Sequence, residues 1–160
     1  MLELYTRKGM HAGWLPTAEG GQGGTGTELS DGILDVKDGH KYLPFVKNGI
    51  NYVETMGRDV VSYNFTGCIM AMYVTAAGSR RVCHVSTGAG QDCKAAWDRI
   101  KASAKKVKEF KPHEHISTQG IAFKGCYGII TADDRCFSVT MVQQNGQAGL
   151  MSIVAEQVEV

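Results

Sequence analysis

The sequence has little proline, almost no net charge and no long apolar run. Only 3 of its 160 residues are proline and 20 are glycine, a pairing that favours many turns between short strands over long helices. With 17 basic and 16 acidic side chains the formal net charge is +1, which argues against a nucleic-acid-binding domain that is basic throughout. No apolar run approaches the ~18 residues of a membrane span, and the N-terminus lacks a secretory-signal pattern. We expect no nucleic acid partner and no membrane span.

Cysteine is present, but not in the patterns of a disulfide framework or a zinc site. The five cysteines cannot all pair within one chain, and there is no C-x-x-C motif. We therefore expect a chain that folds with free thiols, as in the cytoplasm, and that holds no metal. A free cysteine is most often a small buried apolar residue, so a chemical role has to come from its neighbours. The five are Cys68, Cys83, Cys93, Cys126 and Cys136.

The length and an apolar content of 43% suit one domain over residues 1–160 with a single core. Short segments rich in valine, isoleucine and tyrosine, bounded by glycine, asparagine or aspartate, are typical of strands. They are Ile33–Val36, Tyr42–Val46, Ile50–Glu54, Asp59–Tyr63, Ile69–Thr75, Arg81–Ser86, Ile116–Phe123, Tyr127–Thr131, Cys136–Gln143 and Leu150–Val158. Ala132-Asp133-Asp134 and Asn145-Gly146 are typical of hairpin turns.

The segment Asp92–Phe110 breaks the strand pattern. Apolar residues spaced by 3, 4 and 3 positions form the stripe of an amphipathic helix: Trp97, Ile100, Ala104 and Val107. Asp92 can cap its start, and Pro112 ends it. We therefore expect an α/β fold, a mixed and mainly antiparallel β-sandwich flanked by one principal amphipathic helix.

The helix segment is also basic. Seven basic and three acidic residues between Gln91 and Lys111 give it a local charge of +4. This pattern is typical of a solvated helix face, and the alternative is a patch that attracts an acidic protein partner or a polyanion.

Glycine is concentrated near the N-terminus. The segment Glu19–Thr27 holds five glycines between Gly20 and Gly26, too many for the interior of a regular element. A phosphate-binding loop would need a Lys-Ser/Thr pair after the last glycine, and Thr27-Glu28 follows instead. We expect residues 1–32 to be rich in loops, with Glu19–Thr27 a mobile loop or a lid.

One cysteine has the neighbours that a nucleophile needs. Gly67 directly precedes Cys68, which lies at a junction between a loop and a strand, and the next strand carries His84. An imidazolium beside a thiol lowers the thiol pKa from its reference value of ~8.5, and the same ring can return the proton to a leaving amine. A third group, such as the hydroxyl of Ser62, would orient the ring. Backbone N–H groups at Gly67 and Cys68 are candidates for an oxyanion hole.

Strand register decides whether the cysteine and the histidine can meet. With a hairpin turn about Ala77-Gly78, His84 would face Ala71 and lie three residues along the strand from Cys68, about 10 Å away. The two side chains would then meet only if the chain curls back at Gly67 or the strand carries a bulge.

The run Thr66-Gly67-Cys68, followed by a strand and His84 and preceded by Ser62, resembles the glutamine deamidases of the cytotoxic necrotising factor fold. That group includes the Burkholderia lethal factor and the chemoreceptor deamidase CheD. The resemblance spans Ser62–Gly88, and Ser62 stands where the family has threonine.

The resemblance implies that Cys68 is the nucleophile, that His84 is the base and then the acid, and that Ser62 or a backbone carbonyl orients His84. It implies hydrolysis of a glutamine side-chain amide through a thioester, without a cofactor. The substrate would be a protein such as a GTPase, a translation factor or a chemoreceptor. The setting would be a bacterial toxin or effector that acts in virulence and reaches its target cell by a route independent of a signal peptide.

Two other functions fit the sequence. A papain-like cysteine peptidase or amidase would use Cys68 with His113 or His115, and in such enzymes the cysteine opens a helix. His113 and His115 could also face one metal ion, but no third ligand is evident. A non-catalytic β-rich binding module would use the basic helix and would not need Cys68.

Overall fold

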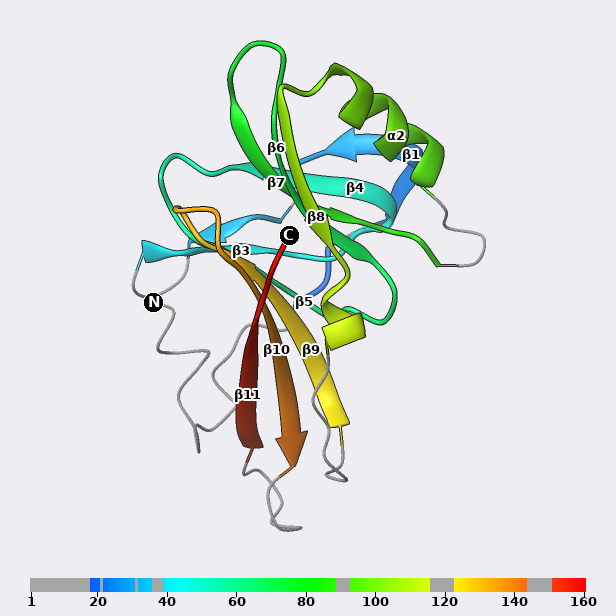
Figure 1. The fold of residues 1–160 in the computed structure, drawn as a ribbon. Helices are drawn as coiled ribbons and strands as arrows, with labels where there is room; N and C mark the ends of the chain where they lie inside the picture. The colour runs from blue at the N-terminus through cyan, green and yellow to red at the C-terminus, as the bar shows by residue number, and fades with distance from the viewer. Residues whose placement is uncertain are drawn as a thin grey trace.

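The computed structural model describes residues 18–20, 22–30, 32–35, 39–88, 93–115, 123–143 and 151–160. Most of these residues lie in strands, which form two sheets beside a single α-helix, α2 (Lys94–Ser103), in the described part of the chain. Figure 1 shows α2 on one side of the molecule, while the C-terminal strands extend on the opposite side. The expected mixed α/β class is confirmed.

The first sheet has the strand order β1-β4-β7-β6-β8. Its members are β1 (Gln22–Leu29), β4 (Lys47–Glu54), β7 (Arg80–Val85), β6 (Ile69–Val74) and β8 (Lys106–Phe110). The pairing of β1 with β4 is parallel, and the other pairings are antiparallel.

The second sheet has the order β11-β10-β9-β5-β3-β2. Its members are β11 (Met151–Val158), β10 (Cys136–Gln143), β9 (Phe123–Ile130), β5 (Val60–Tyr63), β3 (Lys41–Leu43) and β2 (Leu34–Asp35). Among the pairings of the described strands in this sheet, β3 with β5 is the parallel one. The two sheets are therefore mixed and mainly antiparallel, as expected.

Two apolar clusters lie on opposite faces of the first sheet. Between the sheets, Met70 and Val82 of the first sheet join Leu43 and Ile130 of the second in one buried cluster. On the other face, the apolar side chains of the first sheet pack with Trp97 of α2, which is fully buried. The clusters explain the alternating pattern of the strands, because successive residues point to opposite faces.

The observed helix is about half as long as the predicted segment Asp92–Phe110. It covers only Lys94–Ser103, and Lys106–Phe110 is strand β8, paired with β6. The change occurs at Ala104, whose backbone is extended at φ −76° and ψ 142°. Val107 still packs in the cluster of Trp97, so a helix and a strand together satisfy the apolar stripe. The helix cap is Cys93 rather than Asp92, which lies outside the described residues.

The glycine-rich segment is also different from the prediction. Gln22–Leu29 forms β1, an edge strand with Glu28 opposite Ile50 and Leu29 opposite Asn51, so the expected mobile loop over Glu19–Thr27 is wrong. The Glu28 carboxylate accepts hydrogen bonds from Tyr73 and Arg81 of the sheet. Tertiary pairing has overridden the low strand propensity of glycine.

Other boundaries moved less. A single strand, β9, starts at Phe123 where two strands, Ile116–Phe123 and Tyr127–Thr131, were expected, and residues 116–122 lie outside the described part. The hairpin turn at Ala132-Asp133-Asp134 is confirmed, since Asp134 N–H donates to the Thr131 carbonyl at 3.0 Å. The turn at Asn145-Gly146 lies outside the described residues.

Candidate active site

Ser62 and His84 meet between the sheets. Ser62 lies in β5 of the second sheet and His84 in β7 of the first, and Ser62 Oγ is 2.7 Å from His84 Nδ1. The same hydroxyl donates to the Leu43 carbonyl at 2.5 Å. Because a serine hydroxyl has only one proton, Ser62 must accept from a protonated Nδ1. This leaves the other ring nitrogen, Nε2, with a lone pair.

Two aromatic rings hold the imidazole. Phe65 stacks on His84 with 4.0 Å between ring centroids and 8° between the planes, and Phe45 lies 5.2 Å away at 53°. His84 is fully buried, and burial lowers its pKa to about 3. The ring is therefore neutral at physiological pH, with its plane set by the two phenylalanines and its tautomer by Ser62.

Cys68 lies just before β6, at the expected junction between a loop and a strand, and only 7% of it is exposed. Met70 faces His84, and Ile69 faces Val85. Continued by one residue, this register places Cys68 on the same face of the sheet as His84, as its diagonal neighbour. Such pairs have Cα atoms about 7–8 Å apart, within reach of long and aromatic side chains.

The predicted register was wrong by one residue. His84 faces Met70 rather than Ala71 because the hairpin turn is centred on Ala77, with Thr75 N–H donating to the Ser79 carbonyl at 2.9 Å. The shift matters because it puts Cys68 and His84 on one face, so neither a bulge nor a sharp curl at Gly67 is needed.

The cysteine and the histidine are not hydrogen-bonded in this structure. His84 Nε2 is buried and has no hydrogen-bond partner within the described parts of the chain. Burial raises the pKa of the Cys68 thiol, and hydrogen bonding from Thr87 lowers it to a smaller extent. The expected low thiol pKa is therefore wrong for this state, and the resting pair is a neutral thiol and a neutral imidazole.

Gly67 lies at the surface beside the thiol. It is exposed, and a Cβ added to it would meet no atom of the described residues within 4 Å. Thr87 Oγ1 donates to the Gly67 carbonyl at 2.7 Å, which ties the loop before β6 to the end of β7. The open space agrees with the expected approach of a substrate at this glycine, and the oxyanion hole at Gly67 and Cys68 stays a prediction.

A cavity of about 560 Å³ opens next to Gly67. It lies between the ends of β6, β7 and β8 and the first turns of α2. Its lining residues are Thr66, Gly67, Ile69, Thr87, Gly88, Lys94, Trp97, Asp98, Lys101, Glu109 and Lys111. The residues on both sides of Cys68 thus line a hollow of the size that binds small ligands or a few side chains.

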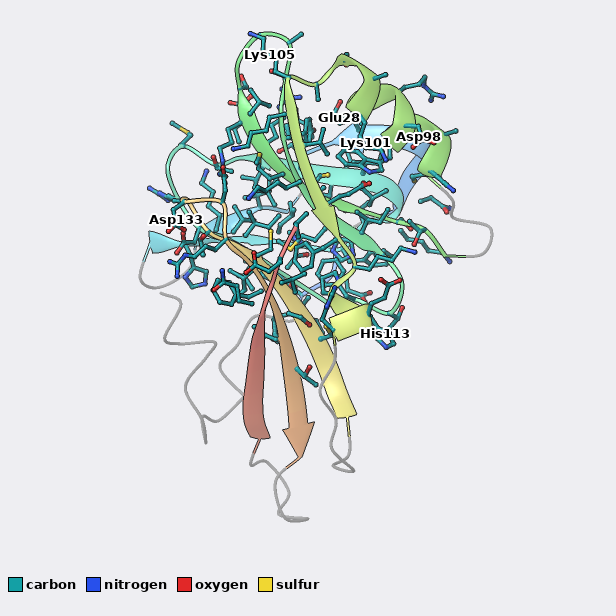
Figure 2. All side chains as sticks on the ribbon, in the orientation of Figure 1. Glu28, Asp98, Lys101, Lys105, His113 and Asp133 are labelled. Carbon is teal, nitrogen blue, oxygen red and sulfur yellow. The ribbon has the colours of Figure 1, made fainter. Side chains whose placement is uncertain are left out.

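The other candidate histidines lie elsewhere. His113 and His115 are in a short 3-10 helix, η3 (Pro112–His115), and His113 is exposed at the surface, as Figure 2 shows. No helix begins at Cys68, since Ile69–Val74 is strand β6. In the described residues, no group of three or more His, Cys, Asp or Glu side chains could hold a metal ion, and no helix is long and apolar enough to cross a bilayer.

Sequence reasoning missed several residues that shape the site. Phe45, Phe65 and the Leu43 carbonyl surround the histidine and the serine, and Thr87 lies against the cysteine. The one available signal was position, because Phe65 lies three residues before Cys68. Comparisons of the chain with protein-family models, with curated proteins and with solved structures find no match.

Proposed function

We propose that this chain is a cysteine-dependent protein-glutamine deamidase that uses Cys68, His84 and Ser62. The observation that carries the proposal is the hydrogen bond of 2.7 Å between Ser62 Oγ and His84 Nδ1. It fixes the tautomer that leaves Nε2 free of a proton, which is the state a general base requires. Buried polar groups are normally hydrogen-bonded, so packing alone does not explain a buried ring that has an orienting hydroxyl on one nitrogen and no partner among the described residues on the other.

The proposed reaction starts from the neutral pair. As the Cys68 sulfur attacks the glutamine amide carbon, its proton passes to His84 Nε2, and backbone N–H groups at Gly67 and Cys68 hold the oxyanion. The imidazolium then protonates the departing amine, ammonia leaves, and a thioester remains. Water, deprotonated by Nε2, hydrolyses the thioester to glutamate and restores the thiol. A primary amine in place of water would give the transglutaminated product.

The surroundings of the ring suit the charge that it must carry for a short time. The imidazolium would keep its hydrogen bond from Nδ1 to Ser62 and would lie against the face of Phe65, and aromatic faces attract cations. Burial of His84 raises the free energy of the imidazolium and so disfavours protonation of the ring in the resting site. The base therefore stays neutral until the thiol proton arrives.

The papain-like alternative has less support, because β6 occupies the place of the helix that such a cysteine opens. A non-catalytic β-rich module is the stronger competitor. One observation favours it: Ser62 and His84 are fully buried, and Cys68 is nearly so. The two proposals differ in what removal of the thiol does.

The test is ammonia release from glutamine-containing peptides and proteins, with mass spectrometry to locate each new glutamate. We expect Cys68→Ala and His84→Gln to abolish release. Cys83→Ala removes a buried thiol on the opposite face of the same sheet and should retain it. Circular dichroism and urea unfolding establish that each variant is folded. Equal activity of Cys68→Ala and the parent chain, or no release from any substrate by the folded parent, would overturn the proposal.

A further inference from the structure

The Gly67 carbonyl is held by a side chain from the neighbouring strand of the sheet. Thr87 follows the end of β7, and its Oγ1 donates to the Gly67 carbonyl at 2.7 Å. This bond lies directly before the proposed nucleophile, Cys68. A trans peptide unit is planar and keeps its C=O and N–H pointing in opposite directions, and the described part of the chain has no cis peptide bond. The bond from Thr87 therefore also fixes the direction of the Cys68 N–H.

The ladder between β6 and β7 gives that direction. Thr75 N–H donates to the Ser79 carbonyl at 2.9 Å, so these two residues form a hydrogen-bonded pair, and such pairs alternate along an antiparallel ladder with pairs that are not bonded to each other. In the register of this hairpin, residues at odd-numbered positions before Thr75 direct their backbone N–H and C=O to β7, and those at even-numbered positions direct them to β8. Continued past the start of β6, the alternation directs the Gly67 carbonyl to β7, in agreement with its bond from Thr87. It directs the Cys68 N–H to the β8 side.

On the β8 side, strand pairing ends before it reaches the Cys68 N–H. The last pair of β6 with β8 is Met70 opposite Phe110, so the position opposite Cys68 would be that of Pro112. There η3 begins, and the Pro112 carbonyl accepts from Ser138 Oγ of the second sheet at 2.7 Å. Among the described residues, the backbone hydrogen bonds outside helices and strands include none from the Cys68 N–H. This N–H is therefore available to hold an oxyanion beside the thiol.

We infer that Thr87 is a positioning residue, whose hydroxyl holds the peptide unit between Gly67 and Cys68 so that the Cys68 N–H binds the oxyanion. The inference rests on the proposed function and adds a residue that acts through this N–H. As the Cys68 sulfur bonds to the amide carbon, an electron pair of the C=O moves onto the oxygen, and the thiol proton passes to His84 Nε2. The N–H of a nucleophile is well placed to hold this oxygen, because the oxygen and the sulfur are then bonded to the same carbon.

An aldehyde tests the oxyanion hole separately from the thiol. Propanal, labelled with ¹³C in its carbonyl group, has the length of a glutamine side chain and no leaving group, so the Cys68 thiol adds across its C=O and the reaction stops at a hemithioacetal. NMR gives the dissociation constant of this adduct, with Cys68→Ala as the blank. Iodoacetamide alkylates the same thiol by displacing iodide and forms no oxyanion. Its rate at Cys68, followed by mass spectrometry, therefore reports the thiol alone.

Three variants locate the effect. Thr87→Val removes the hydroxyl and should weaken the propanal adduct about threefold to tenfold, the factor that one neutral hydrogen bond contributes, with the alkylation rate nearly unchanged. For ammonia release, kcat should fall by a similar factor at constant KM. Thr87→Ser keeps the hydroxyl and should restore the adduct. Thr75→Val is the matched control, because Thr75 Oγ1 accepts from Ser79 N–H at 3.1 Å at the other end of the same hairpin, and it should leave the adduct unchanged.

Three outcomes would overturn the inference: an unchanged adduct in Thr87→Val, an equal loss of adduct and alkylation in that variant, or no recovery of the adduct in Thr87→Ser. Failure of the proposed function is a separate result. A folded parent chain that is alkylated at Cys68 but forms no adduct and releases no ammonia would overturn the deamidase and this inference together. An active parent chain with an unaffected Thr87→Val would overturn this inference alone.

Discussion

The two faces of the first sheet are built in different ways. The buried cluster on the face toward α2 is apolar, with Cys83 and Val85 of β7 packed near Trp97, and the carboxylates on this face are partly exposed. On the face between the sheets, buried polar side chains lie within an apolar cluster. Among them are His84 and, from the opposing sheet, Ser62. Both faces exclude water, so packing alone does not require the polar groups, and burying them costs free energy unless each is hydrogen-bonded.

The comparison also separates the cysteines. Cys83 is fully buried, and burial raises its pKa well above the usual value. Cys68 lies just before strand β6, next to an exposed glycine and a cavity, on the face that carries a neutral histidine whose Nε2 has no partner among the described residues. The same residue type is a core side chain on one face and a candidate nucleophile on the other.

Removal of the Ser62 hydroxyl should have the largest effect on the polar face. Ser62→Ala leaves His84 Nδ1 and the Leu43 carbonyl without their partner, and each buried group left unsatisfied costs about 1–3 kcal/mol. We expect the free energy of unfolding, measured in urea, to fall by about 2–6 kcal/mol, and ammonia release to fall with it. Ser62→Thr keeps the hydroxyl and should retain most of both. Equal losses in the two variants would mean that the hydroxyl does not matter.

Gly128 tests how tightly the polar face is packed. A Cβ at this position would lie 2.6 Å from Met70 Sδ, 2.8 Å from Pro112 Cγ and 3.2 Å from Phe65 Cε2. Gly128→Ala should therefore lower the free energy of unfolding by about 1–3 kcal/mol, the usual range for overpacking, and disturb the ring that stacks on His84. In Gly67→Ala the new Cβ meets no atom within 4 Å in the part of the chain that the structure describes, so this variant should leave stability nearly unchanged. Similar unfolding midpoints for the two variants would contradict this packing.

The buried histidine predicts a gradual loss of stability in acid, with a small change in the free energy of unfolding for each pH unit. The pKa of His84 is lowered from 6.5 to about 3 by burial, so below pH 6.5 the unfolded chain binds a proton that the folded chain does not. The contribution of His84 is complete above pH 6.5 and is lost progressively down to about pH 3, at up to about 1.4 kcal/mol per pH unit. Urea unfolding between pH 7 and 4 should show a shallower slope for His84→Gln than for the parent chain.

The sequence predicted the strands best where one side of each strand is apolar. It failed at β1, because a run of glycines has no periodicity and its strand exists only through pairing with β4. It also overextended α2, since the apolar stripe of Trp97 and Val107 suits a helix as well as a helix followed by a strand. Both errors come from contacts between segments that are distant in the chain.

The candidate site was predicted in part. Spacing and a resemblance pointed to Ser62, Cys68 and His84, and the structure brings Ser62 and His84 into a hydrogen bond. The position of Cys68 depended on the strand register. The hairpin turn is centred half a residue away from the predicted centre, and this small difference shifts the pairing of β6 with β7 by one residue. Phe45 and Thr87 could not be predicted, because they reach the site from loops whose paths follow from the packed sheets.

The tautomer of His84 tests the central claim most directly. In protein labelled with ¹⁵N-histidine, the two ring nitrogens of His84 can be assigned by comparison with His84→Gln and read by NMR at neutral pH. We predict a neutral ring with the proton on Nδ1 and none on Nε2, and loss of this signature in Ser62→Ala. A proton on Nε2, or a ring that titrates near pH 6.5, would contradict the account.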